Sequence, residues 1–133
     1  MEIRYVEEED FEGIYTMSES CGVEAGMKQI EPSQIASLLI RSLDKELGAY
    51  VAVEDDKIVG AVVFSPASDN FSAETDIVVI HICVDRNYRD SGVFEKLLNN
   101  IKDNYKGCSV AISLPRMVKH KLLQPTGYIY EVK

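Results

Sequence analysis

Residues 79–101, VIHICVDRNYRDSGVFEKLLNNI, organise the rest of the expected structure. A nearly continuous apolar, mostly β-branched run over 77–84 predicts a strand that is covered on both faces and is therefore central. After Gly92, apolar residues recur at helical spacing, which predicts an amphipathic helix with one buried face. A strand that passes through a short polar loop into a helix leaves backbone N–H groups directed out of the helix start. Such groups can bind a phosphate.

The flanking sequence predicts strands and helices in alternation. Asp10 can cap a helix that starts at Phe11, and Ser33 can cap a second helix whose apolar stripe runs to Leu47 and which Gly48 ends. The remaining expected elements are a strand near 3–6, a hairpin of 49–54 and 57–65, a strand over 109–114, a helix over 116–123 and a last strand near 128–132. We therefore expect one α/β domain over 1–133.

The composition of the chain indicates which partners it can bind and in which compartment it is expected. The net charge of −8 should repel nucleic acid and anionic membranes and favours a cationic or amine-bearing partner. The amino terminus has no apolar signal core and no stretch reaches transmembrane length, so we expect a cytoplasmic protein. The odd number of cysteines, three, favours reduced thiols, and no Cys/His pair suggests a metal.

The segment VDRNYRDSGVFEKLL, residues 84–98, resembles the acetyl-CoA loop of the GNAT family of N-acetyltransferases. The positions that fall in step are Val84, Tyr88, Arg89, Gly92, Leu97 and Leu98. Two positions differ, because Asp90 stands where Gly is usual and Phe94 where Gly or Ala is usual. Residues 50–64 and the pair Gly127 and Tyr128 extend the resemblance over most of the chain. The alternative is a strand-to-helix turn that uses glycine for packing and binds no ligand.

The resemblance implies a mixed, mainly antiparallel central sheet with helices on both faces. It also implies that the central strand runs beside the pantetheine arm of acetyl-CoA and that the loop amides hold the pyrophosphate. The cofactor-binding residues are then Ile82, Cys83, Val84, Arg89, Asp90, Ser91, Gly92, Val93 and Phe94. We expect the Phe94 ring to obstruct the phosphate site in part and Asp90 to add repulsion.

The residues for proton transfer depart from the family pattern. The family's base usually stands four or six residues before the loop valine, and Ile80 and Val78 occupy those positions. His81 is one residue out of register and should face the opposite side of the strand unless a bulge re-aims it. A packed core histidine is the alternative. His120 is the candidate that protonates the thiolate leaving group, and a solvated basic helix face is its alternative.

Two functions follow from these observations. The first is an acetyl-CoA-dependent N-acetyltransferase that transfers an acetyl group to a primary amine of a small molecule or protein. The second is a protein that keeps the fold without acetyl-CoA turnover and serves as a structural or interaction module. The apolar last strand, with Tyr130 and Val132, also makes a homodimer plausible.

Overall fold

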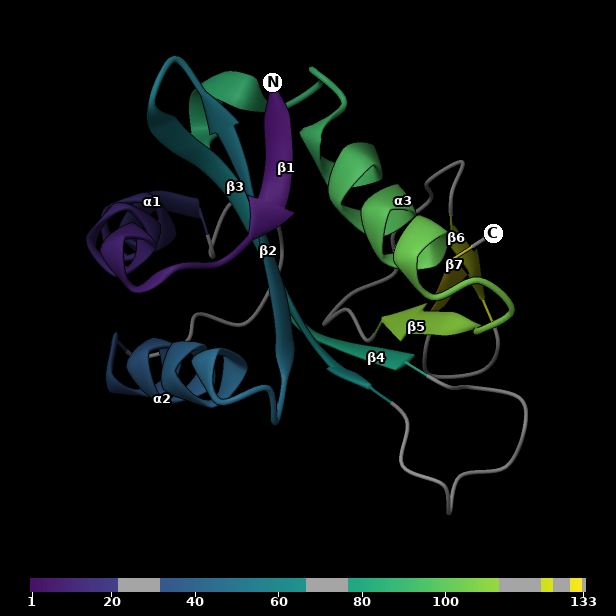
Figure 1. Ribbon diagram of the computed structural model, residues 1–133. Helices are drawn as coiled ribbons and strands as arrows, with labels where there is room; N and C mark the ends of the chain where they lie inside the picture. Colours follow the sequence, from purple (N-terminus) through teal and green to yellow (C-terminus); the bar gives the residue numbers. More distant parts are fainter. Residues whose placement is uncertain (22–31, 67–76, 113–122, 126–129, 133) are drawn as a thin grey trace.

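The computed structural model describes residues 1–21, 32–66, 77–112, 123–125 and 130–132 (Figure 1). The described elements are β1 (Glu2–Tyr5), the short 3-10 helix η1 (Glu8–Asp10), α1 (Phe11–Cys21), α2 (Pro32–Leu43), β2 (Gly48–Glu54), β3 (Lys57–Pro66), β4 (Ile77–Val84), the 3-10 helix η2 (Arg86–Tyr88), α3 (Val93–Asn104), β5 (Val110–Ile112), β6 (Leu123–Pro125) and β7 (Tyr130–Val132).

The strands form one mixed sheet in the order β1-β2-β3-β4-β5-β7-β6. Of the strand pairs in the described residues, β4 with β5 is parallel and the others are antiparallel. The parallel pair follows from the connection, because α3 carries the chain from the end of β4 back to the start of β5. The expected mainly antiparallel sheet with a central 77–84 strand is confirmed.

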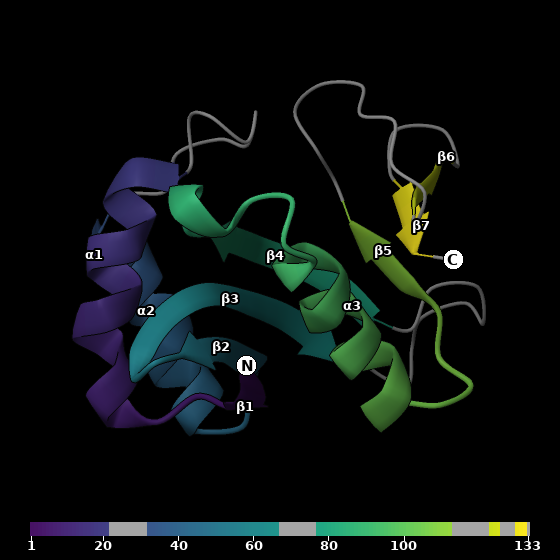
Figure 2. The ribbon, with the colours of Figure 1, turned by 90° about the horizontal axis from the view of Figure 1, so that it is seen from above.

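Helices cover both faces of the sheet, as expected (Figures 1 and 2). α1 and α2 lie on one face, over a core that includes Ile14, Leu39 and Val51. α3 lies on the other face, and Leu97, Leu98 and Ile101 are fully buried there. Side chains that alternate along β3 and β4 supply both cores. No helix in the described part of the chain is long and apolar enough to cross a membrane.

Two expected boundaries were wrong. The second helix ends at Leu43 instead of continuing to Leu47. Lys45 adopts a left-handed φ of 63°, and the amides of Glu46 and Leu47 both donate to the Arg41 carbonyl, which closes the helix early. Leu47 is still buried, in the core beneath α2. Of the expected helix over 116–123, Leu123 begins strand β6, and 116–122 lie outside the described residues.

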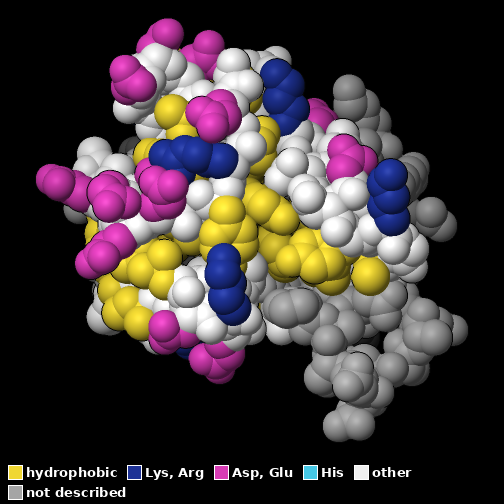
Figure 3. All heavy atoms as spheres, in the orientation of Figure 1, with side chains coloured by type: hydrophobic (Ala, Val, Ile, Leu, Met, Phe, Trp, Pro, Cys, Tyr) yellow, Lys and Arg dark blue, Asp and Glu magenta, His cyan; other side chains and the backbone are white. Residues whose placement is uncertain are grey.

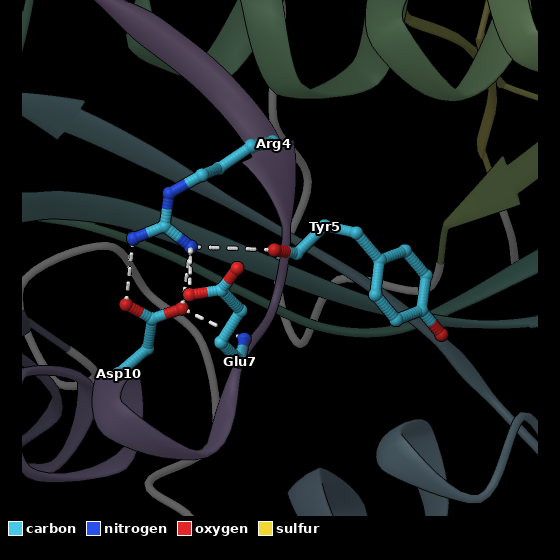
Figure 4. A network of polar contacts seen from close by, with 4 residues as sticks. All are labelled: Arg4, Tyr5, Glu7 and Asp10. Carbon is cyan, nitrogen blue, oxygen red and sulfur yellow. Dashed lines mark hydrogen bonds and ion pairs between the residues drawn. The ribbon is translucent and has the colours of Figure 1, made fainter.

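The start of the chain is tied to α1 by an ion pair (Figure 4). The Arg4 guanidinium donates to both carboxylate oxygens of Asp10, at 2.7 and 2.8 Å, and the Glu7 amide donates to Asp10 Oδ2 at 2.8 Å. Asp10 is buried. Burial alone would raise the pKa of Asp10, but the Arg4 and Glu7 hydrogen bonds and the Arg4 charge outweigh it and lower the pKa. β1 is thereby held at the edge of the sheet.

The surface charge and the state of the cysteines bear on the remaining expectations from the sequence. Acidic side chains gather over α1 and the β2–β3 turn on the face shown in Figure 3. Cys83 is disulfide-bonded, so the expectation of reduced thiols is wrong for this residue, whereas Cys108 is not part of a disulfide. A homodimer that pairs through the edge of β7 is less favoured than expected from the sequence. Both edges of β7 are already paired, one with β5 and the other with β6.

Candidate functional site

The central strand has an open edge. β5 pairs with β4 only over Ile77–Val79, whereas β4 continues to Val84. Figure 2 shows the two strands diverging beyond that point. In the part of the chain that the structure describes, residues 80–84 therefore have β3 on one side and no paired strand on the other. At about 3.3 Å per residue, this edge offers roughly 16 Å of extended backbone to a ligand.

A β-bulge lies where this edge begins. Val63 of β3 is opposite His81, but the next residue, Phe64, is opposite Val79, so Ile80 is an extra residue in β4. Val78 is opposite Ser65, which points to the same face as Val63. His81 and Val78 therefore face the same side of the sheet. From the sequence alone the two side chains are expected on opposite sides unless a bulge intervenes, and the bulge is present.

His81 lies inside the protein on the face covered by α1 and α2. It is 6% exposed, and its Nε2 atom has no hydrogen-bond partner among the described residues. Burial lowers the pKa of His81 below its usual 6.5, so the ring is neutral at pH 7. A buried polar nitrogen without a partner is uncommon in proteins and points to a bound water or to a chemical role.

The two positions expected to carry a base are exposed and apolar. Val78 is 43% exposed and Ile80 is 38% exposed. Their neighbours Ile77, Val79 and Ile82 are buried. Neither exposed side chain can accept a proton, so β4 presents a hydrophobic wall where the open edge begins.

The loop after β4 is anchored by Asp85. Its amide donates to the Val59 carbonyl at 2.8 Å, and its Oδ1 accepts from the Asn87 amide at 2.8 Å. Its Oδ2 lies 3.4 Å from Lys57 Nζ. These contacts tie the end of β4 to the start of β3. They hold η2 and the glycine turn beside the open edge.

The turn into α3 contains two residues with a left-handed backbone. Asp90 has a φ of 65° and Gly92 a φ of 86°, both left-handed. Asp adopts this conformation more readily than most residues, which explains how it stands where Gly is usual. The hydrogen bonds within α3 begin with the Lys96 amide, which donates to the Gly92 carbonyl at 3.0 Å. The amides of Gly92 and Val93 come before this first bond of the helix and lie at the positive end of the helix dipole.

The expected cofactor residues do not all contribute in the same way. The side chains of Ile82, Cys83 and Val93 are buried, so only their backbones can meet a ligand. Ser91 is exposed and Arg89 half-buried, and the Ser91 hydroxyl donates to the Tyr88 carbonyl.

Phe94 and Val84 both pack against the core beneath α3. For Phe94, this packing favours the inward orientation of the ring over one that covers the phosphate site. Of the other candidates, His120 lies outside the described residues.

Comparison with known proteins assigns the family. The model of the acetyltransferase (GNAT) family matches residues 10–121. The chain belongs to the GNAT family. No protein among those of curated function matches its sequence.

Solved structures share the fold at low identity. A GNAT-family protein described as a putative acetyltransferase, from Desulfovibrio desulfuricans, superposes with a TM-score of 0.68 at 19% identity, covering 84% of this chain and 71% of that one. A GNAT-family N-acetyltransferase from Escherichia coli in complex with CoA gives 0.62 at 21%, covering 84% and 61%. The E. coli ribosomal-protein-S18-alanine N-acetyltransferase gives 0.63 at 13%, covering 84% and 64%. The chain thus spans less than two thirds of the last two.

Three features of the site were not predicted from the sequence. They are the bulge at Ile80, the Asp85–Lys57 anchor and the close packing of Gly60 under α3. Gly60 carried a signal, because a glycine inside a strand often marks a close approach of another element. The other two depend on pairing between strands and leave no mark in the local sequence.

Proposed function

We propose that the protein is an acetyl-CoA-dependent N-acetyltransferase that acts on a primary amine. The observation that carries the proposal is the continuity of the open edge of β4 with the glycine turn and the first turn of α3. These parts form one track that leads from an open strand edge to a helix N-terminus. Between them, the amides of Asp85, Tyr88 and Ser91 are held by hydrogen bonds within the protein. The GNAT relative solved with CoA supports the same cofactor.

The residues of this track fit the chemical groups of acetyl-CoA. Backbone N–H and C=O groups along 80–84 can pair with the amides of the pantetheine arm, as an added strand would. The amides of Gly92 and Val93 can donate to the pyrophosphate at the positive end of α3. Asp90 is exposed beside this turn, and its charge weakens the site for an anion. Bound acetyl-CoA supplies the activated acetyl group.

Proton transfer is assigned to the two histidines. An alkylammonium must lose a proton before it attacks a thioester. His81 is neutral and faces the same side as Val78, so it can receive this proton through a water molecule bound at its unpartnered Nε2. Its lowered pKa makes it a weak base, and we expect transfer to accelerate as the pH approaches the pKa of the amine. His120 is the proposed donor to the thiolate.

Isothermal titration calorimetry with acetyl-CoA, followed by measurement of free CoA released in the presence of amines, tests the proposal. We expect saturable binding. At a cofactor concentration one hundred times the dissociation constant, the free energy of unfolding should rise by about 2.7 kcal/mol. CoA release should require the amine. The absence of binding at millimolar acetyl-CoA would contradict the proposal and favour the alternative, an interaction module that keeps the fold.

A further inference from the structure

We infer that the acceptor is an amine with an apolar substituent and no second positive charge near the reacting nitrogen. The inference rests on the proposed function and names its substrate class. It is carried by Val78 and Ile80, which form an exposed apolar pair on β4, here called the β4 wall.

The position of the β4 wall follows from the direction of the proposed cofactor track. The pyrophosphate end is fixed at the turn before α3, beyond Val84. The arm then runs back along the open edge, which begins at Ile80 because β5 is paired only as far as Val79. The acetyl group at the far end of the arm is thereby placed at the bulge. The acceptor nitrogen must reach this point, so its substituent lies beside Val78 and Ile80.

The chemistry of the β4 wall selects against a second charge. From Ile77 to Val84 the strand contains no carboxylate and one ionisable side chain that could face an acceptor, the neutral His81. An ammonium group placed against the two aliphatic side chains would lose water without gaining a charged partner. A hydrocarbon substituent would instead remove exposed apolar surface from water on both sides. Both side chains are exposed, whereas the adjacent Ile77, Val79 and His81 are buried.

A matched pair of acceptors tests the inference. The compounds n-pentylamine and 1,4-diaminobutane have the same chain length, and the second replaces a terminal methyl group by an ammonium group. We expect kcat/KM to be at least about tenfold higher for n-pentylamine, the size of a typical one-group discrimination in an apolar pocket.

Matched variants localise the effect. Ile80→Thr and Val78→Thr should each reduce the preference for n-pentylamine severalfold. Ile40→Thr makes the same change as Ile80→Thr at an apolar residue of α2 that is 54% exposed, and should leave the preference unchanged. An equal fall in all three variants would contradict a role for the β4 wall.

The possible failures are distinguishable. Acetyl-CoA binding is measured first by calorimetry, and if it is absent the proposed function and the inference both fail. If acetyl-CoA binds and 1,4-diaminobutane is the equal or better acceptor, or neither amine is acetylated, the inference alone is wrong.

Discussion

Gly60 of β3 lies in direct contact with Val93, the first residue of α3. A Cβ atom added at Gly60 would stand 2.6 Å from Val93 Cγ1 and 3.1 Å from Leu97 Cδ1. Gly60 is also the partner of Val84 in the β3–β4 ladder. This one glycine therefore sets the spacing between the end of the open strand edge and the helix N-terminus, the two halves of the proposed cofactor track.

Gly60→Ala should push the first turn of α3 away from the sheet. We expect it to destabilise the protein by about 1–3 kcal/mol through overpacking and to weaken acetyl-CoA binding at least tenfold. Gly107→Ala is the control, because Gly107 has a φ of 87° and open space around it beyond the far end of α3. It should lower stability through backbone strain but leave cofactor affinity unchanged. Equal affinity of the two variants, measured by calorimetry, would show that the Gly60 contact does not position the site.

Asp90 separates the effects of charge and backbone conformation. Asp90→Asn keeps a residue that tolerates a left-handed φ and removes the charge, so stability should stay within about 1 kcal/mol while acetyl-CoA binds severalfold more tightly. Asp90→Gly should give the same gain in affinity. Asp90→Val should cost about 1–2 kcal/mol of stability, because a β-branched residue resists this conformation. If Asn and Gly bind the cofactor no better than Asp does, the charge at 90 does not act on the pyrophosphate.

Asp10 should govern how stability changes below about pH 4. Its pKa in the folded protein is lowered, so its contribution is complete above the unfolded-state pKa of about 3.9 and is lost as the pH falls through the folded value. Asp10→Asn should cost about 1.5–3 kcal/mol at pH 7, since it removes a charged hydrogen bond at a buried site. The difference from the parent should shrink below about pH 4. Glu9→Gln, an exposed neighbour, is the control. A pH-independent difference in urea unfolding would argue against the ion pair as the cause.

His81 should make stability depend on pH in a higher window. Because burial lowers its pKa, the unfolded chain binds a proton more readily than the folded protein. Stability should therefore fall as the pH drops from about 7 to 5, by up to about 1.4 kcal/mol per pH unit. His81→Gln should flatten this dependence. His120→Gln removes the only other histidine and should not. If the parent and His81→Gln lose stability in parallel over this range, His81 is not the cause of the pH dependence.

The sequence predicted those parts of the fold that periodicity within a single element determines. The apolar run of 77–84 and the helical spacing after Gly92 gave β4 and α3, and the family resemblance gave the layers. Leu47 was expected in the helix because it continues the apolar stripe of α2 by one helical turn. The left-handed turn at Lys45 ends the helix before Leu47 is reached. A lysine at position 45 gives no indication in the sequence that the chain makes this turn.

The site could be predicted only in part. The loop residues were recognisable because their order along the chain is the motif itself. The bulge at Ile80 could not be seen in an uninterrupted apolar run, because no alternation of polar and apolar residues marks an extra residue there. The orientation of His81 depended on that bulge and on its pairing with Val63, which is a long-range contact.

An NMR titration of the isotope-labelled protein with CoA, following the backbone amides, asks directly whether CoA binds along the open edge of β4 and at the turn before α3. We predict saturable shifts concentrated at residues 80–84 and 89–94, with the amides of β1 and α2 unchanged. Shifts that are absent at millimolar CoA, or that concentrate away from the open edge of β4 and the turn before α3, would contradict it.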